Sequence, residues 1–472
     1  MPPAIATAII IGVICGLFTL DRECSSAPSR ALWLPVAWLL IHGSRPVSQW
    51  LSLFGYAPSI TIDTPDVYLD GSPLDRVAYI GLLALGMTIA ILRYPRTAKY
   101  VSKNWPLMLF LLYCAVSVLW SDYGFVAFKR WTKIIGDVLV VSIIVTDVKP
   151  IEAIKRVFAR VAFVLVPLSV LLIKYYSDIG REYNRWTWLP SYRGVAETKN
   201  GLGMLCLVFG LSSLWRVITV YLGKLNRRST QSAVAHSLIL GMVVWLLWMS
   251  NSITAAVCFV LAAGLMTFAM FARIVRKSAV VHLLVLVPTV VVGAVLFSGS
   301  GGAILSTLGR DATLTGRTGI WDAVLSVSGN PFFGSGFESF WLGDRLQKIW
   351  DMTMQGLQEA HNGYLEVYLN LGWVGVGLIA LLIWTGYRNV ISELRNGDRD
   401  APLKLAFFFT ALLYNFTEAG FRETTIVWTA FLIAIASPPL RHVNRVAPMM
   451  SNASFYDGTI RRMRMWSVEG SA

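Results

Sequence analysis

Continuous apolar runs dominate this chain and restrict the folds open to it. A helix needs roughly 20 apolar residues to cross a hydrocarbon core about 30 Å thick. Closed β-barrels also span membranes, but they show alternating stretches of about 10 residues. The runs therefore predict an all-α, polytopic membrane protein with about 12–13 transmembrane helices, since the second and fifth runs are short. The runs are residues 4–20, 31–43, 77–92, 105–120, 134–146, 157–173, 201–218, 234–250, 252–272, 279–298, 364–385, 403–417 and 424–440.

Composition supports the membrane class and argues against other classes. The chain is 55% hydrophobic and 14% charged, too apolar for an ordinary soluble enzyme of 472 residues. Its net charge of +14 does not predict a nucleic-acid partner, because the Lys and Arg residues lie in short clusters beside the apolar runs. The phosphate-binding P-loop, the dinucleotide fingerprint and the nucleophile elbow are absent from the sequence, so we predict no cofactor.

The basic residues also predict the orientation of the chain. When alternate connections are assigned to opposite sides, one set holds most of the 41 Lys and Arg residues, and cytoplasmic loops carry this excess. The C-terminal tail belongs to that set. We therefore predict four regions: an N-terminal transmembrane bundle (1–298), a large outer loop (299–362), C-terminal transmembrane helices (363–442) and a cytoplasmic tail (443–472).

The outer loop at 299–362 has helical signals that argue against disorder. It opens with the flexible run SGSGG (298–302), and a second helical stretch is expected at about 339–357. Thr315 or Thr318 can cap a first short amphipathic helix, lying on the membrane or over a cleft, at about 315–329. The apolar residues of that helix are Ile320, Trp321, Val324, Leu325 and Val327. A loop of this length without disorder signals is expected to carry function.

Two residues of this loop are candidates for chemistry. His361 is its only histidine and stands just before an apolar run. The positive end of the following helix disfavours protonation, so a neutral imidazole suited to a general base is expected. The alternative is an interfacial histidine that only hydrogen-bonds the loop. Arg317 precedes the predicted amphipathic helix, so its guanidinium and the first free backbone N–H groups can converge on an anion such as phosphate.

A second outer segment, residues 174–200, mixes basic and aromatic residues. Its cations include Arg185, Arg193 and Lys199, interleaved with Tyr and Trp. Such a mixture suits a lipid-linked diphosphate that carries sugars. For any single residue, however, the pattern favours a routine interfacial aromatic belt with snorkelling cations.

Cations and carboxylates elsewhere on the predicted outer side leave further alternatives open. Arg130 and Lys133 lie there against the charge bias, which indicates either a functional role or pairing with lipid head groups. Carboxylates in the first outer loop can hold a divalent metal, but their spacing favours turn and capping roles, so no metal site is predicted. These carboxylates are Asp63, Asp66, Asp70 and Asp75.

Three sequence motifs resemble a known family. The stretches GRTGIWDAVLSVSGNPFFGSGFESFW (316–341) and EAHNGYLEVYLNLGWVGVG (359–377) resemble the signature region of the O-antigen ligase and polymerase superfamily of bacterial inner membranes. The stretch ETKNGLG (197–203) resembles a second family motif. Many relatives have His where this chain has Thr198, which leaves His361 as the principal histidine. Close helix packing is the simplest role for the glycines of LGWVGVG, which are Gly372, Gly375 and Gly377.

The resemblance implies a metal-independent, inverting glycosyltransferase of the bacterial inner membrane. Such an enzyme passes a glycan from an undecaprenyl diphosphate carrier to an acceptor hydroxyl at the periplasmic face, on another glycan or on the lipid A core, among membrane lipids. By the resemblance, His361 orients or deprotonates the acceptor hydroxyl and Arg317 neutralises the leaving diphosphate. Substrate contacts are expected from Lys199, Arg193, Arg185, Arg130 and Asn362.

Two other functions stay open at this point. A lipid-linked oligosaccharide flippase would place ionisable groups or broken helices near the membrane midplane, whereas these apolar runs are nearly free of charge. A metal-dependent membrane glycosyltransferase would use the aspartates of the first outer loop and would lose activity on chelation. A ligase and a polymerase cannot be separated by sequence, because the acceptor differs while the chemistry is the same.

Overall fold

The computed structural model describes one compact unit within Met1–Pro439. The described residues are 1–22, 29–56, 69, 71–183, 189–223, 226–271, 278–297, 313–354 and 356–437. Several predictions fall outside them: Arg185, Asp63, Asp66, Asp70, the SGSGG run and the cytoplasmic tail.

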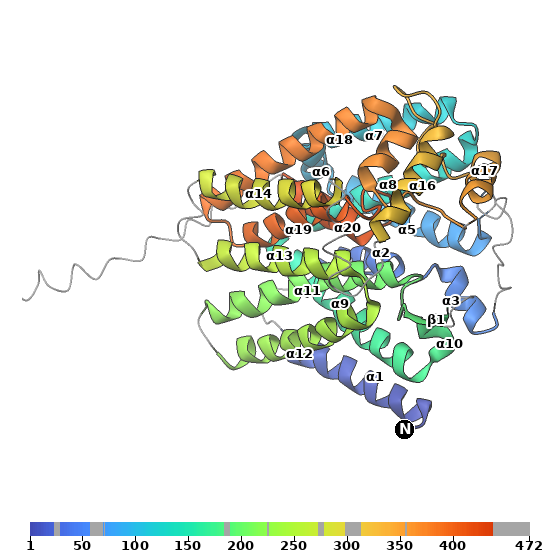
Figure 1. Cartoon of the computed structure of the whole chain (residues 1–472). Helices are drawn as coiled ribbons and strands as arrows, with labels where there is room; N and C mark the ends of the chain where they lie inside the picture. The colour runs from blue at the N-terminus through green and yellow to red at the C-terminus, as the bar shows by residue number, and fades with distance from the viewer. Residues whose placement is uncertain are drawn as a thin grey trace, which may run out of the picture. The chain divides into compact units, whose positions relative to one another are not determined.

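The described residues form an all-α membrane protein, as predicted, with a single two-stranded hairpin (Figure 1). The first half contains α1 (Pro3–Leu20), η1 (Arg30–Leu32), α2 (Trp33–His42), α3 (Val47–Leu53), α5 (Pro73–Leu92), α6 (Tyr94–Lys103), α7 (Trp105–Ser117), η2 (Val118–Trp120), α8 (Gly124–Val145), α9 (Pro150–Tyr175) and α10 (Ser177–Gly180). The second half contains α11 (Lys199–Tyr221), α12 (Arg227–Ser250), α13 (Ile253–Phe271), α14 (Ser278–Phe297), α16 (Thr313–Ser326), α17 (Gly343–Thr353), α18 (Gly363–Asn396), α19 (Ala401–Tyr414) and α20 (Ile426–Ile435).

Every predicted apolar run falls on helix, but the helices differ in length. Within the described residues, seven helices are long and apolar enough to cross a membrane. Helices α6 and α7, bent by 85° at their junction, make an eighth if they are counted as one span. The remaining apolar helices have only 10–17 residues, and α8 carries Lys, Arg and Asp in its sequence. The total of 12–13 crossings therefore stays a prediction.

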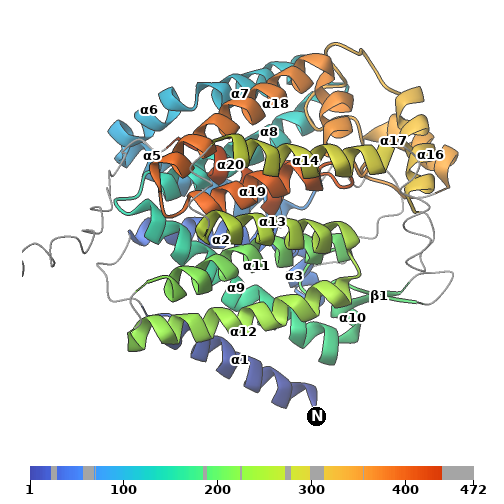
Figure 2. The ribbon, with the colours of Figure 1, turned by 60° about the vertical axis from the view of Figure 1, so that its left-hand side comes forward.

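Burial separates inner helices from peripheral ones. In the most apolar windows of α9 and α11, 72% and 67% of the residues are buried, whereas in α1 and α5 only 11% are. An apolar helix that buries so little of itself inside the protein presents its surface to lipid. Figure 2 shows α1 at the edge of the bundle, with α11 packed between α12 and α13.

The segment after residue 312 forms its own small core. Helices α16 and α17, predicted at about 315–329 and 339–357, pack together and against the start of α18. Ile320 and Val324 of α16 are buried in this core, while Leu325 is 44% exposed. The start of α16 differs from the prediction: the helix begins at Thr313, so Thr315 and Thr318 lie within it and not at its start. Helix boundaries are the least certain feature of a sequence pattern.

Gly372 breaks α18 in its first third. Its backbone adopts φ 64° and ψ −165°, so the predicted run at 364–385 is two helical pieces. The N–H groups freed by the break are satisfied, because Trp373 donates to Pro331 O (2.9 Å) and Val374 donates to Phe332 O (3.2 Å). A Cβ atom on Gly372 would lie 2.3 Å from the Phe332 carbonyl. Close packing thus explains Gly372, whereas a Cβ on Gly377 would touch nothing within 4 Å.

The loops gather at two ends of the bundle. Helix α1 starts beside the end of α9, since Thr7 Oγ1 and Tyr176 Oη lie 2.8 Å apart. That end also holds α3, α10, α16 and α17, at the right of Figure 1. The C-terminal ends of α1 and α11 and the start of α9 lie at the opposite end, because these helices run lengthwise through the bundle. The sequence predicts the first end to be periplasmic and the second cytoplasmic.

Cysteine labelling tests this orientation. We expect Met354→Cys, at a position 89% exposed after α17, to react with a membrane-impermeant maleimide in intact cells. Tyr221→Cys, at a position 72% exposed at the opposite end, should react only after permeabilisation. Both variants are made with Cys15 and Cys24 replaced by Ser. The reverse labelling pattern would contradict the predicted orientation.

Candidate functional site

The site is built around a short turn between α19 and α20. Asn415 shapes this turn, because its side-chain oxygen accepts from Phe421 N at 2.7 Å. The turn also binds the start of α18: Gly363 N donates to the carbonyls of Asn415 (2.9 Å) and Glu418 (3.0 Å). A Cβ on Gly363 would lie 1.7 Å from Asn415 Oδ1, so the contact requires glycine. These contacts place the Glu418 side chain beside His361, which precedes Asn362 and Gly363 in the chain.

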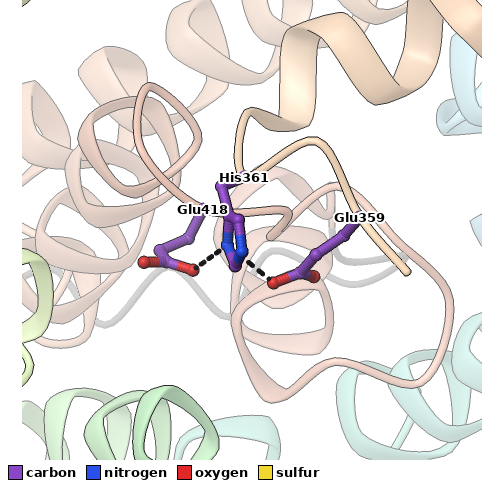
Figure 3. Close-up of side chains that lie close together, drawn as sticks. All are labelled: Glu359, His361 and Glu418. Carbon is purple, nitrogen blue, oxygen red and sulfur yellow. Dashed lines mark hydrogen bonds and ion pairs between the residues drawn. The ribbon is translucent and has the colours of Figure 1, made fainter. Parts of the chain in front are cut away.

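His361 lies between two carboxylates (Figure 3). Its Nδ1 is 3.0 Å from Glu359 Oε1 and 3.2 Å from Glu418 Oε2. The side chain of Glu418 is only 5% exposed, whereas those of Glu359 and His361 are 30% and 26% exposed. Within the described residues, the hydrogen bond and ion pairs of the ring are all made by Nδ1.

Glu418 joins His361 to two other segments. Arg317 Nη2 of α16 lies 3.2 Å from Glu418 Oε1, and Arg317 Nη1 donates to Thr417 O. Asn200 Nδ2, in the first turn of α11, donates to Glu418 Oε2 at 3.0 Å. The buried carboxylate of Glu418 therefore contacts side chains from α11, α16 and the loop before α18. This Glu418 cluster comprises Asn200, Arg317, Glu359, His361 and Glu418.

The backbone around His361 is fixed on both sides. His361 has φ 50°, a left-handed conformation that is uncommon for a residue with a side chain. The preceding Ala360 donates its N–H to Glu366 Oε1 (2.5 Å), and its carbonyl accepts from Trp321 Nε1 (2.9 Å). On the other side, Asn362 Oδ1 accepts from the N–H groups of Tyr364 and Leu365 and caps α18. These contacts stabilise the left-handed backbone conformation of His361, in which its imidazole contacts Glu418.

The two carboxylates change the charge of His361. Burial lowers its pKa, but the hydrogen bonds and negative charges of Glu359 and Glu418 outweigh burial and raise the pKa of His361 to about 10. Burial raises the pKa of Glu359, yet the hydrogen bond and positive charge of His361 outweigh it and hold that pKa below its ordinary value. At neutral pH His361 is thus an imidazolium, and the expectation of a neutral ring is wrong. The positive end of α18 affects the pKa of His361 less than the two carboxylates that contact the ring.

The predicted residues Arg317, Lys199 and Asn362 lie at or next to the cluster. Arg317 lies within α16 and does not precede it, so its guanidinium binds Glu418 and Thr417 instead of sharing an anion with the free N–H groups at the helix start. Lys199 is exposed at the first position of α11, next to Asn200. Thr198, the departure from the family motif, caps α11 by accepting from Gly201 N at 3.0 Å.

Other predicted residues lie elsewhere. Arg193 donates from Nε to Ile179 O (3.2 Å) beside the hairpin of β1 (Arg181–Tyr183) and β2 (Pro190–Tyr192), in which Arg181 pairs with Tyr192. Arg130, on α8, donates to the Glu338 carbonyl. Asp75 accepts from Ser48 N and Oγ at 2.9 and 2.5 Å, which is a structural role at the start of α3.

The Glu418 cluster also contains a geometry suited to a metal ion. One ligand atom each from Glu359, His361 and Glu418 lies within 4.8 Å of the others. Such a set matches the nitrogen and oxygen ligands of a divalent transition metal, provided that His361 is neutral. In the arrangement described, the His361 proton and the Arg317 guanidinium already balance the two carboxylates.

Sequence reasoning missed Glu359, Glu418 and Asn200. Glu359 stands two residues before His361, and Glu418 lies between two apolar runs. An ionisable residue at the end of a span is a functional candidate, so the TEAGFRE stretch (417–423) contained a usable signal. Asn200 carried a weaker one, as a member of the ETKNGLG motif.

Comparison with known proteins finds two similarities. The O-Antigen ligase family matches residues 236–380, a range that contains both Arg317 and His361. This match supports the predicted resemblance to the O-antigen ligase and polymerase superfamily. It is 21% identical over 359 residues to the exopolysaccharide production protein ExoQ of Rhizobium meliloti (strain 1021). That similarity covers 74% of this chain and 79% of the relative. Together the two similarities support a glycosyl-transferring function of the ligase and polymerase type.

Proposed function

We propose that this enzyme transfers a glycan from undecaprenyl diphosphate to an acceptor hydroxyl at the periplasmic face of the inner membrane. The observation that carries the proposal is the shared carboxylate: Arg317 and His361 bind the two oxygens of Glu418. A cation for the leaving group and a polar ring for the acceptor thus lie beside each other. The site also lies at the end of the bundle, where a lipid-linked donor can enter from the bilayer.

Charge on the leaving group is the main chemical requirement. When the sugar–phosphate bond breaks, the diphosphate departs with negative charge, and positive groups stabilise that charge. Arg317 and the exposed Lys199 supply this charge in the proposal. The positive N-terminal end of α11, which begins at Lys199, adds to it.

His361 acts in the proposal as an imidazolium that positions oxygen atoms. Its Nε2–H donates to the acceptor oxygen or to a phosphoryl oxygen, while Glu359 and Glu418 hold Nδ1. The acceptor hydroxyl forms the new bond to the sugar, the bond to the diphosphate breaks, and the hydroxyl proton passes to a carboxylate. Glu359 suits that transfer because its carboxylate is ionised and 30% exposed.

This role predicts a specific pH dependence. The His361 pKa is raised, so the imidazolium and its ion pairs are fully present below the ordinary value of 6.5 and are lost as pH rises through about 10. Glycan transfer should therefore decline on the alkaline side. Glu359→Gln removes both the proton acceptor and a charge that raises the pKa of His361, so transfer should fall at every pH and the residual transfer should begin to decline at lower pH. The rate of transfer by purified enzyme, measured from pH 6 to 10, checks both; a rate that rises with pH as His361 deprotonates would indicate a neutral base instead.

The product class follows from surface carbohydrate in a deletion strain. The name of the Rhizobium relative refers to exopolysaccharide production, and the family description names a ligase, so both product classes are candidates. Gel analysis after gene deletion separates them, because single-unit caps indicate a lost polymerase and unattached long chains a lost ligase. Surface carbohydrate unchanged from the parent strain would contradict both.

A further inference from the structure

A basic cavity lies at the end of the bundle opposite the Glu418 cluster. It has a volume of about 360 Å³ and is formed by the end of α1, the first half of α9 and the C-terminal part of α11. The charged residues that line it are the cations Arg22, Lys155, Arg156, Arg160 and Arg216 and the carboxylates Asp21 and Glu152. The sequence predicts this end to be cytoplasmic.

The positive charge of the cavity is only partly balanced. Arg216 Nη2 lies 3.3 Å from Asp21 Oδ1, and Lys155 Nζ lies 2.8 Å from Glu152 Oε1. These two pairs use both carboxylates of the lining. Within the part of the chain that the structure describes, Arg22, Arg156 and Arg160 have no carboxylate partner. Three positive charges are therefore left over around one cavity.

Arg156 and Arg160 both contribute positive charge to the cavity. They are four residues apart on α9, so their side chains leave the same face of the helix. The Arg160 guanidinium lies 4.2 Å from the ring centroid of Trp33, which positions it without neutralising it. Uncompensated cations beside a membrane attract an anion, and guanidinium groups bind phosphate oxygens in pairs.

The walls of the cavity favour a lipid over a soluble anion. Only 11% of helix α1 is buried inside the protein, and Ile5, Ile9 and Ile11 are each at least half exposed. Trp33, under Arg160, is 58% exposed, as is typical of a tryptophan at the membrane interface. Acyl chains can therefore run along α1 while the head group occupies the cavity beside Arg22 and Arg156.

We propose that this cavity binds the phosphate head group of an anionic phospholipid. The site is separate from the Glu418 cluster, and the inference does not depend on the proposed glycan transfer. The leftover charge of Arg22, Arg156 and Arg160 selects a net negative head group, and the exposed face of α1 selects an attached lipid. A bound anion also offsets the repulsion among these cations.

A titration with short-chain lipids tests the proposal. The probes are phosphatidylglycerol, phosphatidylcholine with the same acyl chains, and inorganic phosphate, each titrated into the detergent-purified full-length protein. We expect phosphatidylglycerol to bind at least about tenfold more tightly than phosphatidylcholine. Each cation near a charged lipid is expected to contribute about fivefold, so Arg156→Gln with Arg160→Gln should weaken phosphatidylglycerol binding about 25-fold. A matched control, Arg227→Gln with Arg228→Gln, removes two exposed cations from the same end and should change binding less than about twofold.

Each other outcome would overturn the proposal. Equal weakening in both double variants would mean diffuse attraction without a site. Inorganic phosphate that displaces phosphatidylglycerol at an equal concentration would identify a soluble anion as the ligand. If the Gln variant does not fold, Arg156→Lys with Arg160→Lys keeps the charge and should bind phosphatidylglycerol within about fivefold of the parent. Equal affinity of the parent for phosphatidylglycerol and phosphatidylcholine would overturn the proposal without any variant.

Discussion

His361→Ala should lower glycan transfer by about 10²–10⁴-fold while the protein still accumulates in the membrane. The side chain is 26% exposed, and among the described residues its polar contacts are with Glu359 and Glu418 outside the bundle helices, so its removal is expected to leave the bundle packing intact. The measurement is surface glycan in a deletion strain complemented with the variant, with protein quantified in the same membranes.

A matched control separates this loss from a general effect of removing histidine. His282, exposed on α14 and bonded to Tyr387 Oη at 2.5 Å, lies away from the Glu418 cluster. His282→Ala should retain nearly parental transfer. Normal surface glycan in the His361→Ala strain would contradict the proposed site.

Glu418→Ala should cause both a loss of transfer and a loss of stability. It removes the acceptor shared by Asn200, Arg317 and His361, and Glu418 is 5% exposed. Removing one partner of a buried ion pair costs about 3–5 kcal/mol, and the 20% exposure of Arg317 places this case near 3 kcal/mol. Transfer should fall because Arg317 and His361 are no longer held beside each other. Thermal unfolding in detergent and transfer by the same preparation measure both effects.

Two comparisons sharpen the Glu418 prediction. Asp122→Asn breaks an ion pair of 2.8 Å with Arg345, but Asp122 is 62% exposed, so stability should change by less than about 0.5 kcal/mol. Glu418→Gln keeps the hydrogen-bond acceptor for Asn200 but removes the charge. Its transfer should be as low as that of Glu418→Ala if charge is the essential property. Parental transfer by Glu418→Gln would argue against the charged cluster.

Much of the fold could be predicted because membrane helices are specified by local composition. Each apolar run became a helix, and α16 and α17 appeared where helical spacing and turn residues indicated them. The break at Gly372 could not be predicted in this way. Its positive φ is stabilised by contacts with Phe332 and Pro331, which are far away in the sequence. A run of apolar residues does not predict such a long-range contact.

The candidate site was only half visible in the sequence. His361 and Arg317 stood out by residue type and by resemblance to a family, but their common partner did not. Glu418 lies 57 residues from His361 in the chain and meets it only after α18 and α19 have packed. The charge of His361 depends on that meeting. A local argument from the helix end therefore gave the wrong protonation state.

The most direct test is transfer by the purified protein in proteoliposomes that contain only an undecaprenyl diphosphate-linked glycan and an acceptor. The account predicts that undecaprenyl diphosphate is released as the glycan is transferred, that EDTA does not slow this release, and that Glu418→Ala and His361→Ala reduce it to background. Release that continues unchanged in both variants would contradict the account, and release abolished by EDTA would instead assign the Glu359, His361 and Glu418 set to a metal ion.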